Sequence, residues 1–258
     1  MPDLSGRVAL ITGASSGIGA ATEGLLVDQG AKVYSADMAV PDPPGQSIGL
    51  RPGGGIASLR LDVRDESNWE GGIAHVLERE GRLDILVHSA GISSASPLPE
   101  TTLAEWRRVL ATNLDGGFLA IKHGVRAMTP DGGAIVVVGS ASGIRPSAGA
   151  AAYSTSKAAL SMLARTAAKE CRDVGLPVRI NVVSPGGVKT PMWRQMAFFQ
   201  DLVREHGSED AAFAELEAAG GGRFADPVDI ARSILFLVSD AANDITGAEL
   251  PVDFGYTL

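Results

Sequence analysis

The sequence predicts an α/β fold in which a parallel sheet carries helices on both faces. Short β-rich segments alternate with segments of helical periodicity along most of the 258 residues. Residues 134–138 are apolar at every position, which is typical of a strand buried on both faces of a parallel sheet. Glycine is abundant, at 32 residues, and fits a fold with many tight strand-to-helix turns. With right-handed crossovers, this alternation gives one sheet wrapped on both sides.

The expected elements follow from local patterns along the chain. Strands are expected at the β-rich runs 7–11, 32–36, 58–61, 83–87, 134–140, 178–183 and 248–252. Helices are expected after Gly19, around 69–77, and over 103–128, 152–171 and 227–238. Residues 38–55 hold four prolines and five glycines without periodicity, so we expect an exposed loop there. No internal repeat occurs, and residues 1–258 are expected to form a single domain.

Composition excludes several classes of partner. A net charge of −8 and a pI near 5.0 argue against nucleic acid or an anionic membrane. Cys171 is the only cysteine, so no intramolecular disulfide can form and a reducing compartment is favoured. The start lacks a signal peptide, and no apolar run is long enough for a bilayer, so a cytoplasmic location is expected. The histidines lack metal-site spacing, and no metal is expected.

A glycine-rich turn follows the first expected strand. Gly13, Gly17 and Gly19 precede a helical pattern, where missing side chains let the backbone approach a ligand and helix amides face an anion. Asp37 ends the second strand, twenty residues beyond Gly17 (37 − 17), where a carboxylate can bind an adenosine ribose. A glycine turn with an unrelated surface aspartate is the alternative. The order strand, turn, helix, strand and acid favours a dinucleotide site.

Tyr153 and Lys157 are four residues apart, so on a helix they share one face. A tyrosine hydroxyl has a pKa near ~10 and can act at neutral pH only if its anion is stabilised, which a lysine ammonium one turn away can do. The pair alone also fits an ordinary surface helix. Ser140 ends the apolar strand thirteen residues earlier, at the edge where open α/β sheets bind ligands.

The spacing of Gly13, Gly17 and Gly19, together with Tyr153-x-x-x-Lys157, resembles the short-chain dehydrogenase/reductase family, over essentially the whole chain. The resemblance implies a single-domain, Rossmann-like, doubly wound parallel sheet of about seven strands with helices on both faces. It also implies reversible hydride transfer between a nicotinamide cofactor and an alcohol/carbonyl pair.

The resemblance implies four catalytic residues. Tyr153 would pass the proton to or from the substrate oxygen, and Lys157 would lower the tyrosine pKa and hold the nicotinamide ribose. Ser140 would orient the substrate oxygen. Asn113 matches the family's asparagine, which interrupts the long helix and supports the proton route; the alternative is that Asn113 simply faces solvent.

A cofactor site is implied in the same way. Its expected residues are Gly13, Ser15, Ser16, Gly17, Ile18, Gly19, Asp37, Asp62, Val63, Ser89, Ala90, Gly91, Tyr153, Lys157, Pro185, Gly186, Val188 and Thr190. The pair at 62–63 would contact adenine, and the segment 185–190 would close over the nicotinamide. His88 and Ser89 stand where the family usually has two asparagines; we expect His88 to bond to backbone, a role as base staying open. Asp37 would repel a 2′-phosphate, so NAD is expected rather than NADP.

Residues 190–222 bear on the substrate. Their apolar residues Met192, Trp193, Met196, Phe198 and Phe199 form either a core helix or a substrate lid, and Arg194 could bind an anion. We expect a lid and a hydrophobic secondary alcohol or ketone. Alternatives are an inactive nucleotide-sensing module, a 3-oxoacyl-thioester reductase, a sugar dehydrogenase, and an epimerase or dehydratase on a nucleotide-linked sugar. A homotetramer is expected from the family, with helices around 104–128 and 152–171 facing symmetry mates.

Overall fold

The computed structural model describes residues 2–39, 56–129 and 131–258 of the chain. The described strands are β1 (Val8–Thr12), β2 (Lys32–Asp37), β3 (Ile56–Arg60), β4 (Ile85–His88), β5 (Gly133–Val138), β6 (Val178–Pro185) and β7 (Glu249–Val252). They form one sheet in the order β3-β2-β1-β4-β5-β6-β7, with every pair parallel. The order reverses beside β1, which creates a crevice between β1 and β4 at the carboxyl ends of the strands.

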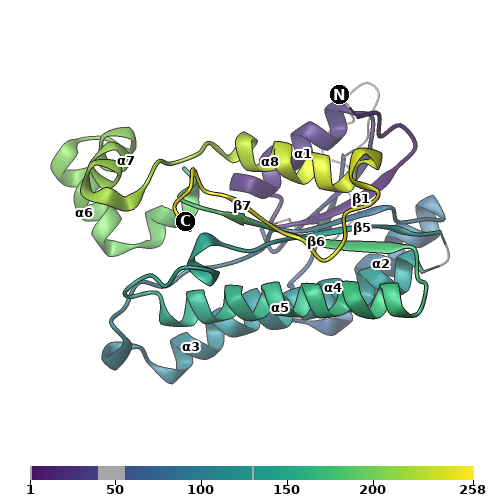
Figure 1. The fold of residues 1–258 in the computed structure, drawn as a ribbon, viewed down its shortest axis with the longest axis horizontal. Helices are drawn as coiled ribbons and strands as arrows, with labels where there is room; N and C mark the ends of the chain where they lie inside the picture. Colours follow the sequence, from purple (N-terminus) through teal and green to yellow (C-terminus); the bar gives the residue numbers. More distant parts are fainter. Residues whose placement is uncertain (1, 40–55, 130) are drawn as a thin grey trace.

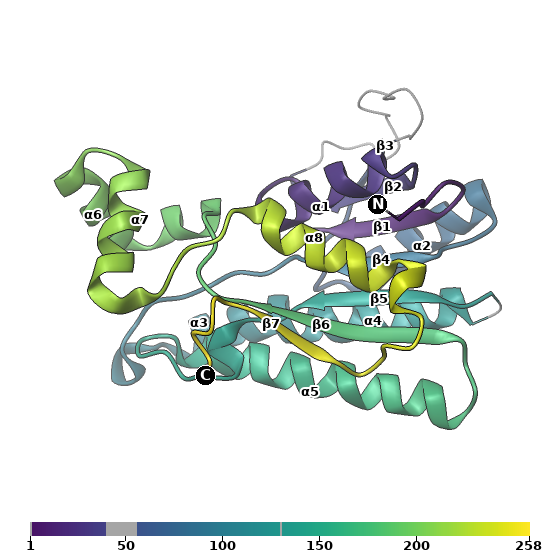
Figure 2. The ribbon, with the colours of Figure 1, turned by 45° about the horizontal axis from the view of Figure 1, so that its top comes forward.

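Helices cover both faces of the sheet (Figures 1 and 2). The described α-helices are α1 (Gly17–Asp28), α2 (Glu66–Glu80), α3 (Leu103–Leu110), α4 (Gly116–Met128), α5 (Ala151–Asp173), α6 (Ala197–His206), α7 (Glu209–Leu216) and α8 (Pro227–Val238). In Figure 1, α1 and α8 lie together above the sheet, and α2, α4 and α5 lie below it. The predicted single-domain, doubly wound fold is therefore confirmed.

Strand β5 shows why the sheet has two apolar faces. Ile135 and Val137 join the core beneath α4 and α5, whereas Val136 and Val138 join the core beneath α1 and α8. Successive strand residues point to opposite faces, so a run that is apolar at every position fills both cores. The reading of residues 134–138 as a fully buried strand is correct.

The helices α6 and α7 stand apart from these layers, past one end of the sheet (Figure 1). They have a small apolar core of their own, in which the ring centroid of Phe213 lies 4.8 Å from that of Phe199 and 5.1 Å from that of Phe224. Trp193 packs its ring against Phe224 at the edge of this core, with 5.2 Å between the centroids. A separately packed pair of helices at the rim can change its position without opening the main cores.

Differences from the expected elements are small. Strand ends differ by one or two residues, because they are set by pairing with neighbouring strands rather than by local composition. The expected helix over 103–128 is α3 and α4 joined by a π-helical turn, Ala111–Asp115. The loop expected over residues 38–55 lies mostly outside the described residues. Among the described helices, none combines the length and apolarity needed to cross a membrane.

Candidate active site

A cavity of about 520 Å³ opens at the carboxyl ends of the strands, beside the point where the strand order reverses. The segments that follow β1, β4, β5 and β6 contribute to its wall, and so do residues before α6 and at the chain's end. The predicted site residues in its lining are Gly13, Ser16, Gly17, Ile18, Asp37, Val63, Ser89, Ala90, Gly91, Ser140, Tyr153, Lys157, Pro185, Gly186, Val188 and Thr190. The other four, Ser15, Gly19, Asp62 and Asn113, are not part of the lining.

The glycine turn after β1 is shaped by close backbone approaches. Gly13 has φ +68°, and a Cβ there would lie 2.8 Å from the Cα of Ala90. Gly19 lies in the first turn of α1, and a Cβ there would lie 2.2 Å from the carbonyl oxygen of Gly13. Gly17 and Ile18, at the start of α1, line the cavity, and the first amides of a helix have no intrahelical acceptor. The turn therefore offers backbone donors to an anion.

Asp37 lies at the end of β2 on the cavity wall. Its carboxylate accepts hydrogen bonds from the amides of Ser15, at 3.2 Å, and Ala39, at 3.0 Å. Ser15 thus positions Asp37 rather than lining the cavity. Asp62 also differs from expectation, because its carboxylate pairs with Arg64 while Val63 lines the wall.

The turn after β4 is supported by a buried histidine. The Nδ1 atom of His88 lies 3.0 Å from the hydroxyl of Thr12, so the expectation of a backbone partner was wrong. Burial first, and the Lys157 charge second, lower the pKa of His88 to about 3, which keeps the ring neutral. The Thr12 hydroxyl also accepts from the amide of Ala90 at 3.4 Å. His88 thus belongs to a network that holds the turn.

Asn113 occupies the π-helical turn between α3 and α4 and is fully buried, which excludes the solvent-facing alternative. Its side chain accepts from the amide of Ile92 and donates to the carbonyl of Ile92, both at 2.9 Å. It also donates to the Ser156 hydroxyl at 3.0 Å. A Cβ on Gly91 would lie 3.3 Å from Asn113 Oδ1 and 3.4 Å from Lys157 Nζ. Asn113 therefore packs close to the lysine without lining the cavity.

Ser140, Tyr153 and Lys157 converge on the cavity wall. Lys157 Nζ donates to the carbonyl of Val138 at 2.7 Å and lies 5.8 Å from the centroid of the Tyr153 ring. Burial raises the pKa of Tyr153, and a hydrogen bond with Ser140 opposes that rise. Burial lowers the pKa of Lys157 to about 8. The expected lowering of the tyrosine pKa by Lys157 is thus not what the structure gives: desolvation is the larger effect, and the ammonium faces a β5 carbonyl.

Apolar residues before and within α6 form another part of the wall. Met192, Trp193, Met196 and Phe198 line the cavity, and the Trp193 indole donates to the carbonyl of Val188 at 2.9 Å. Phe199 is only 1% exposed and packs inside the α6–α7 core, so its expected contact with substrate was wrong. The reason is helical geometry, because adjacent residues of α6 point in different directions.

Arg194, which was expected as an anion-binding alternative, is not in the cavity lining. Its guanidinium pairs with Glu209 at 2.7 Å, and its side chain is 62% exposed. The described cavity wall therefore takes no charge from Arg194.

Several lining residues were missed in the sequence analysis. Ser93 and Ser94 follow β4, Ser142 and Ser147 follow Ser140, and Tyr256 lies near the chain's end. Proximity to Ser140 could have indicated the serines at 142 and 147. Tyr256 is distant from every motif, and only the fold brings it to the site.

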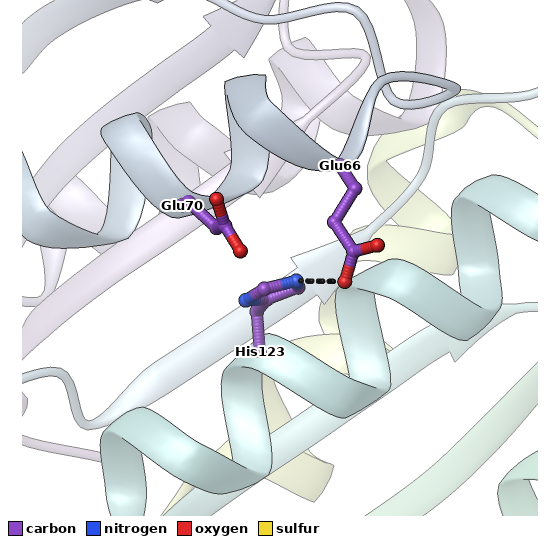
Figure 3. Close-up of side chains that lie close together, drawn as sticks. All are labelled: Glu66, Glu70 and His123. Carbon is purple, nitrogen blue, oxygen red and sulfur yellow. Dashed lines mark hydrogen bonds and ion pairs between the residues drawn. The ribbon is translucent and has the colours of Figure 1, made fainter.

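A group of potential metal ligands lies outside the cavity lining (Figure 3). Glu66 and Glu70 of α2 and His123 of α4 have ligand atoms within 4.8 Å of one another. The Glu66 carboxylate already binds the Lys122 ammonium and lies 3.3 Å from His123 Nε2. Lys122 first and His123 second hold the pKa of Glu66 below its usual range. The Glu66 carboxylate is thus already engaged by a cation of the chain itself.

Comparisons with known proteins agree with the geometry. The model of a family described as enoyl-(acyl carrier protein) reductase matches residues 13–257. A 2,5-dichloro-2,5-cyclohexadiene-1,4-diol dehydrogenase of Sphingobium indicum is 36% identical over 257 residues, covering 99% of this chain and 98% of its own. A cyclopentanol dehydrogenase of Comamonas testosteroni is 35% identical over 260 residues, covering 100% and 99%. The crystal structure of levodione reductase superposes with a TM-score of 0.83 at 30% identity, covering 98% of each chain.

Proposed function

The chain belongs to the short-chain dehydrogenase/reductase family and is an oxidoreductase of secondary alcohols and ketones; we propose that it uses NAD, takes hydrophobic substrates and employs Tyr153 as its acid/base. One observation carries the proposal. Ser140, Tyr153 and Lys157 line the same cavity as the glycine turn and Asp37. A single cavity thus offers groups for proton transfer and groups for a dinucleotide.

The residues present fit a nicotinamide dinucleotide. Gly13 and Gly91 line the cavity, and a Cβ at these positions would lie 2.8 Å from Ala90 Cα and 3.3 Å from Asn113 Oδ1, so glycine lets this part of the wall pack closely. Gly17 and Ile18 would hold the phosphates, Asp37 the adenosine ribose, and Lys157 the nicotinamide ribose. When bound, the cofactor would supply or accept the hydride.

Asp37 favours NAD over NADP, because its carboxylate would repel a 2′-phosphate. Its neighbour Met38, which also lines the cavity, offers no compensating cation. We expect a much higher kcat/KM with NAD in the wild type. Replacing Asp37 by serine and Met38 by arginine should shift the preference toward NADP. Equal kcat/KM for both cofactors in the wild type would contradict this assignment.

Proton transfer is assigned to the chain's own groups. Tyr153 gives its hydroxyl proton to a carbonyl oxygen in reduction and takes it back in oxidation. Ser140 hydrogen-bonds the same substrate oxygen and orients it. Lys157 supplies positive charge beside the tyrosine, and Asn113 holds the backbone next to that lysine.

The substrate class follows from the apolar wall. Met192, Trp193, Met196 and Phe198 present little that would bind a phosphate or a carboxylate. Burying about 100 Å² of apolar substrate surface contributes about 2.5 kcal/mol, which a polyol would largely forgo. The names of the relatives point to ring alcohols, in agreement with this wall. We assign residues 190–222, which include these side chains, as a substrate lid.

The test measures reduced nicotinamide by absorbance over a panel of secondary alcohols, ketones and free sugars. We expect kcat/KM to rise with the apolar area of the substrate. Tyr153→Phe should lower kcat by at least about a hundredfold while cofactor affinity stays near the wild-type value, because only the proton carrier is lost. A Tyr153→Phe enzyme with near-normal kcat would refute the mechanism.

Reduction of an acyl thioester is the second candidate, because the matching family model is described as an enoyl-(acyl carrier protein) reductase. Acyl thioesters in the same panel distinguish the two. Higher kcat/KM with a 3-oxoacyl or enoyl thioester than with any alcohol would favour this second reading.

A homotetramer in the cytoplasm completes the proposal. Phe118 of α4 and Met162 of α5 are 47% and 58% exposed, and an assembly would cover them. Light scattering of the purified protein at micromolar concentration should give four times the mass of one chain. A monomer would rule the assembly out.

A further inference from the structure

Tyr256 is a cavity residue that the proposed machinery does not use. It lies two residues before the end of the chain and lines the same cavity as Tyr153 and Trp193. Its segment follows β7, a parallel strand whose carboxyl end lies at the same edge of the sheet as the cavity. A side chain from the chain's end thus completes the wall.

A tight turn holds this segment in place. The buried carboxylate of Asp253 accepts from the amides of Gly255 and Thr257, both at 3.0 Å, and from the Thr257 hydroxyl at 2.7 Å. The turn packs on the segment expected at the nicotinamide, since a Cβ on Gly186 would lie 3.0 Å from Asp253 Cα. Tyr256 therefore stands on a fixed base.

Two other segments clamp Tyr256 itself. Arg145, in the loop after Ser140, donates from Nη1 to the carbonyl of Tyr256 at 2.7 Å, and its guanidinium carbon lies 4.7 Å from the ring centroid. Gly222, at the end of the proposed lid, is so close that a Cβ there would lie 3.3 Å from Tyr256 Cδ2. Next to it, the Arg223 guanidinium carbon lies 4.5 Å from the ring centroid of Phe254.

We propose that Tyr256 is a specificity-determining residue, whose clamped ring limits the size of the alcohol that the cavity admits. The proposal rests on the dehydrogenase function proposed above. Arg145 contacts both the backbone carbonyl and the ring of Tyr256, and Gly222 lies close to the ring edge, so the ring cannot move aside for a larger substrate without disturbing these contacts. The residue sets substrate size and takes no part in proton transfer.

The experiment compares kcat/KM for cyclopentanol and for a fused two-ring alcohol, decahydronaphthol, in the wild type, Tyr256→Ala and Tyr256→Phe. In Tyr256→Ala, kcat/KM for decahydronaphthol divided by kcat/KM for cyclopentanol should rise by about tenfold or more. Removing the tyrosine side chain leaves space that only the larger alcohol fills. Tyr256→Phe keeps the ring and should keep the wild-type ratio. Arg145→Met should raise the ratio by a smaller factor. The KM for NAD should stay unchanged in all three variants.

Every other outcome of this experiment contradicts either the role of Tyr256 or the dehydrogenase function. An unchanged ratio in Tyr256→Ala, or an equal change in Tyr256→Phe, overturns the assignment and leaves the dehydrogenase function intact. An equal fall in kcat/KM for both alcohols, with a raised KM for NAD, indicates a merely structural role for Tyr256 and also overturns the assignment. If the wild type oxidises neither alcohol with NAD but reduces other substrates, the proposed function fails, and this assignment with it. Tyr256→Leu provides the same comparison should the alanine variant not fold.

Discussion

Replacing Lys157 by methionine should change how the stability of the protein depends on pH. The Lys157 side chain is buried in the cavity wall, where its Nζ donates to the carbonyl of Val138, and burial lowers its pKa from 10.5 to about 8. In the unfolded chain the ammonium is hydrated and keeps its proton up to about pH 10.5. Between pH 8 and 10.5 the unfolded chain therefore binds more protons than the folded one.

The sign and the size of the effect follow from this difference. Stability rises with pH wherever the unfolded state binds more protons, so Lys157 raises the free energy of unfolding as pH increases from 8 to 10.5. At about 1.4 kcal/mol for each pH unit, the full interval amounts to roughly 3 kcal/mol. Below pH 8 both states are protonated, and the destabilisation from burying the charge is constant.

The assay is urea unfolding followed by tryptophan fluorescence, at one protein concentration, from pH 7 to 10.5. The free energy of unfolding of the wild type minus that of Lys157→Met should be flat up to about pH 8 and then rise by roughly 3 kcal/mol. Lys169→Met, on the same helix, is the matched control because its side chain is 65% exposed. A difference that stays flat throughout, or that rises equally in the control, would refute the reasoning.

Two further pairs of variants test the glycine turn and the α6–α7 segment. Gly19→Ala should abolish cofactor binding or folding, because its Cβ would lie 2.2 Å from the Gly13 carbonyl oxygen; Gly24→Ala on the same helix meets nothing within 4 Å and should be neutral or slightly stabilising. Calorimetric titration with NAD distinguishes the two variants, and equal behaviour would contradict the close packing at Gly19. Trp193→Ala should raise the KM for apolar alcohols with little effect on global stability, whereas Phe199→Ala should destabilise the α6–α7 core by about 3 kcal/mol or more. Faster proteolytic cleavage within residues 197–216 would report the loosened core, and a Phe199→Ala variant as resistant as the wild type would contradict the prediction.

The sequence predicted the fold, the glycine turn and the Tyr153–Lys157 pair, because these depend on local sequence patterns. The unbroken apolar run at 134–138 predicted β5, and glycine spacing marked the turn at positions 13–19. Helical spacing put Tyr153 and Lys157 on one face, and both line the cavity. Each of these inferences used only residues a few positions apart, or two strands joined by one crossover connection.

Predictions that depended on three-dimensional surroundings fared less well. The partner of His88 is a threonine hydroxyl from β1, which no local pattern specifies. Phe199 belongs to a separate small core rather than to the cavity, because the facing of α6 is set by α7. The pKa of Tyr153 rises because burial outweighs the hydrogen bond with Ser140, and burial depth is a property of the folded molecule.

The segment after β7 also decides where the protein can be labelled. Leu258 is fully exposed, but it lies only two residues beyond Tyr256, whose side chain lines the cavity. A bulky label at Leu258 would therefore be attached next to the cavity wall. Ser5 and Gly6 are also exposed, and they precede the amino end of β1, at the opposite edge of the sheet from the carboxyl ends. Labels for kinetic work and tethers for surface immobilisation therefore belong at the amino edge of the sheet.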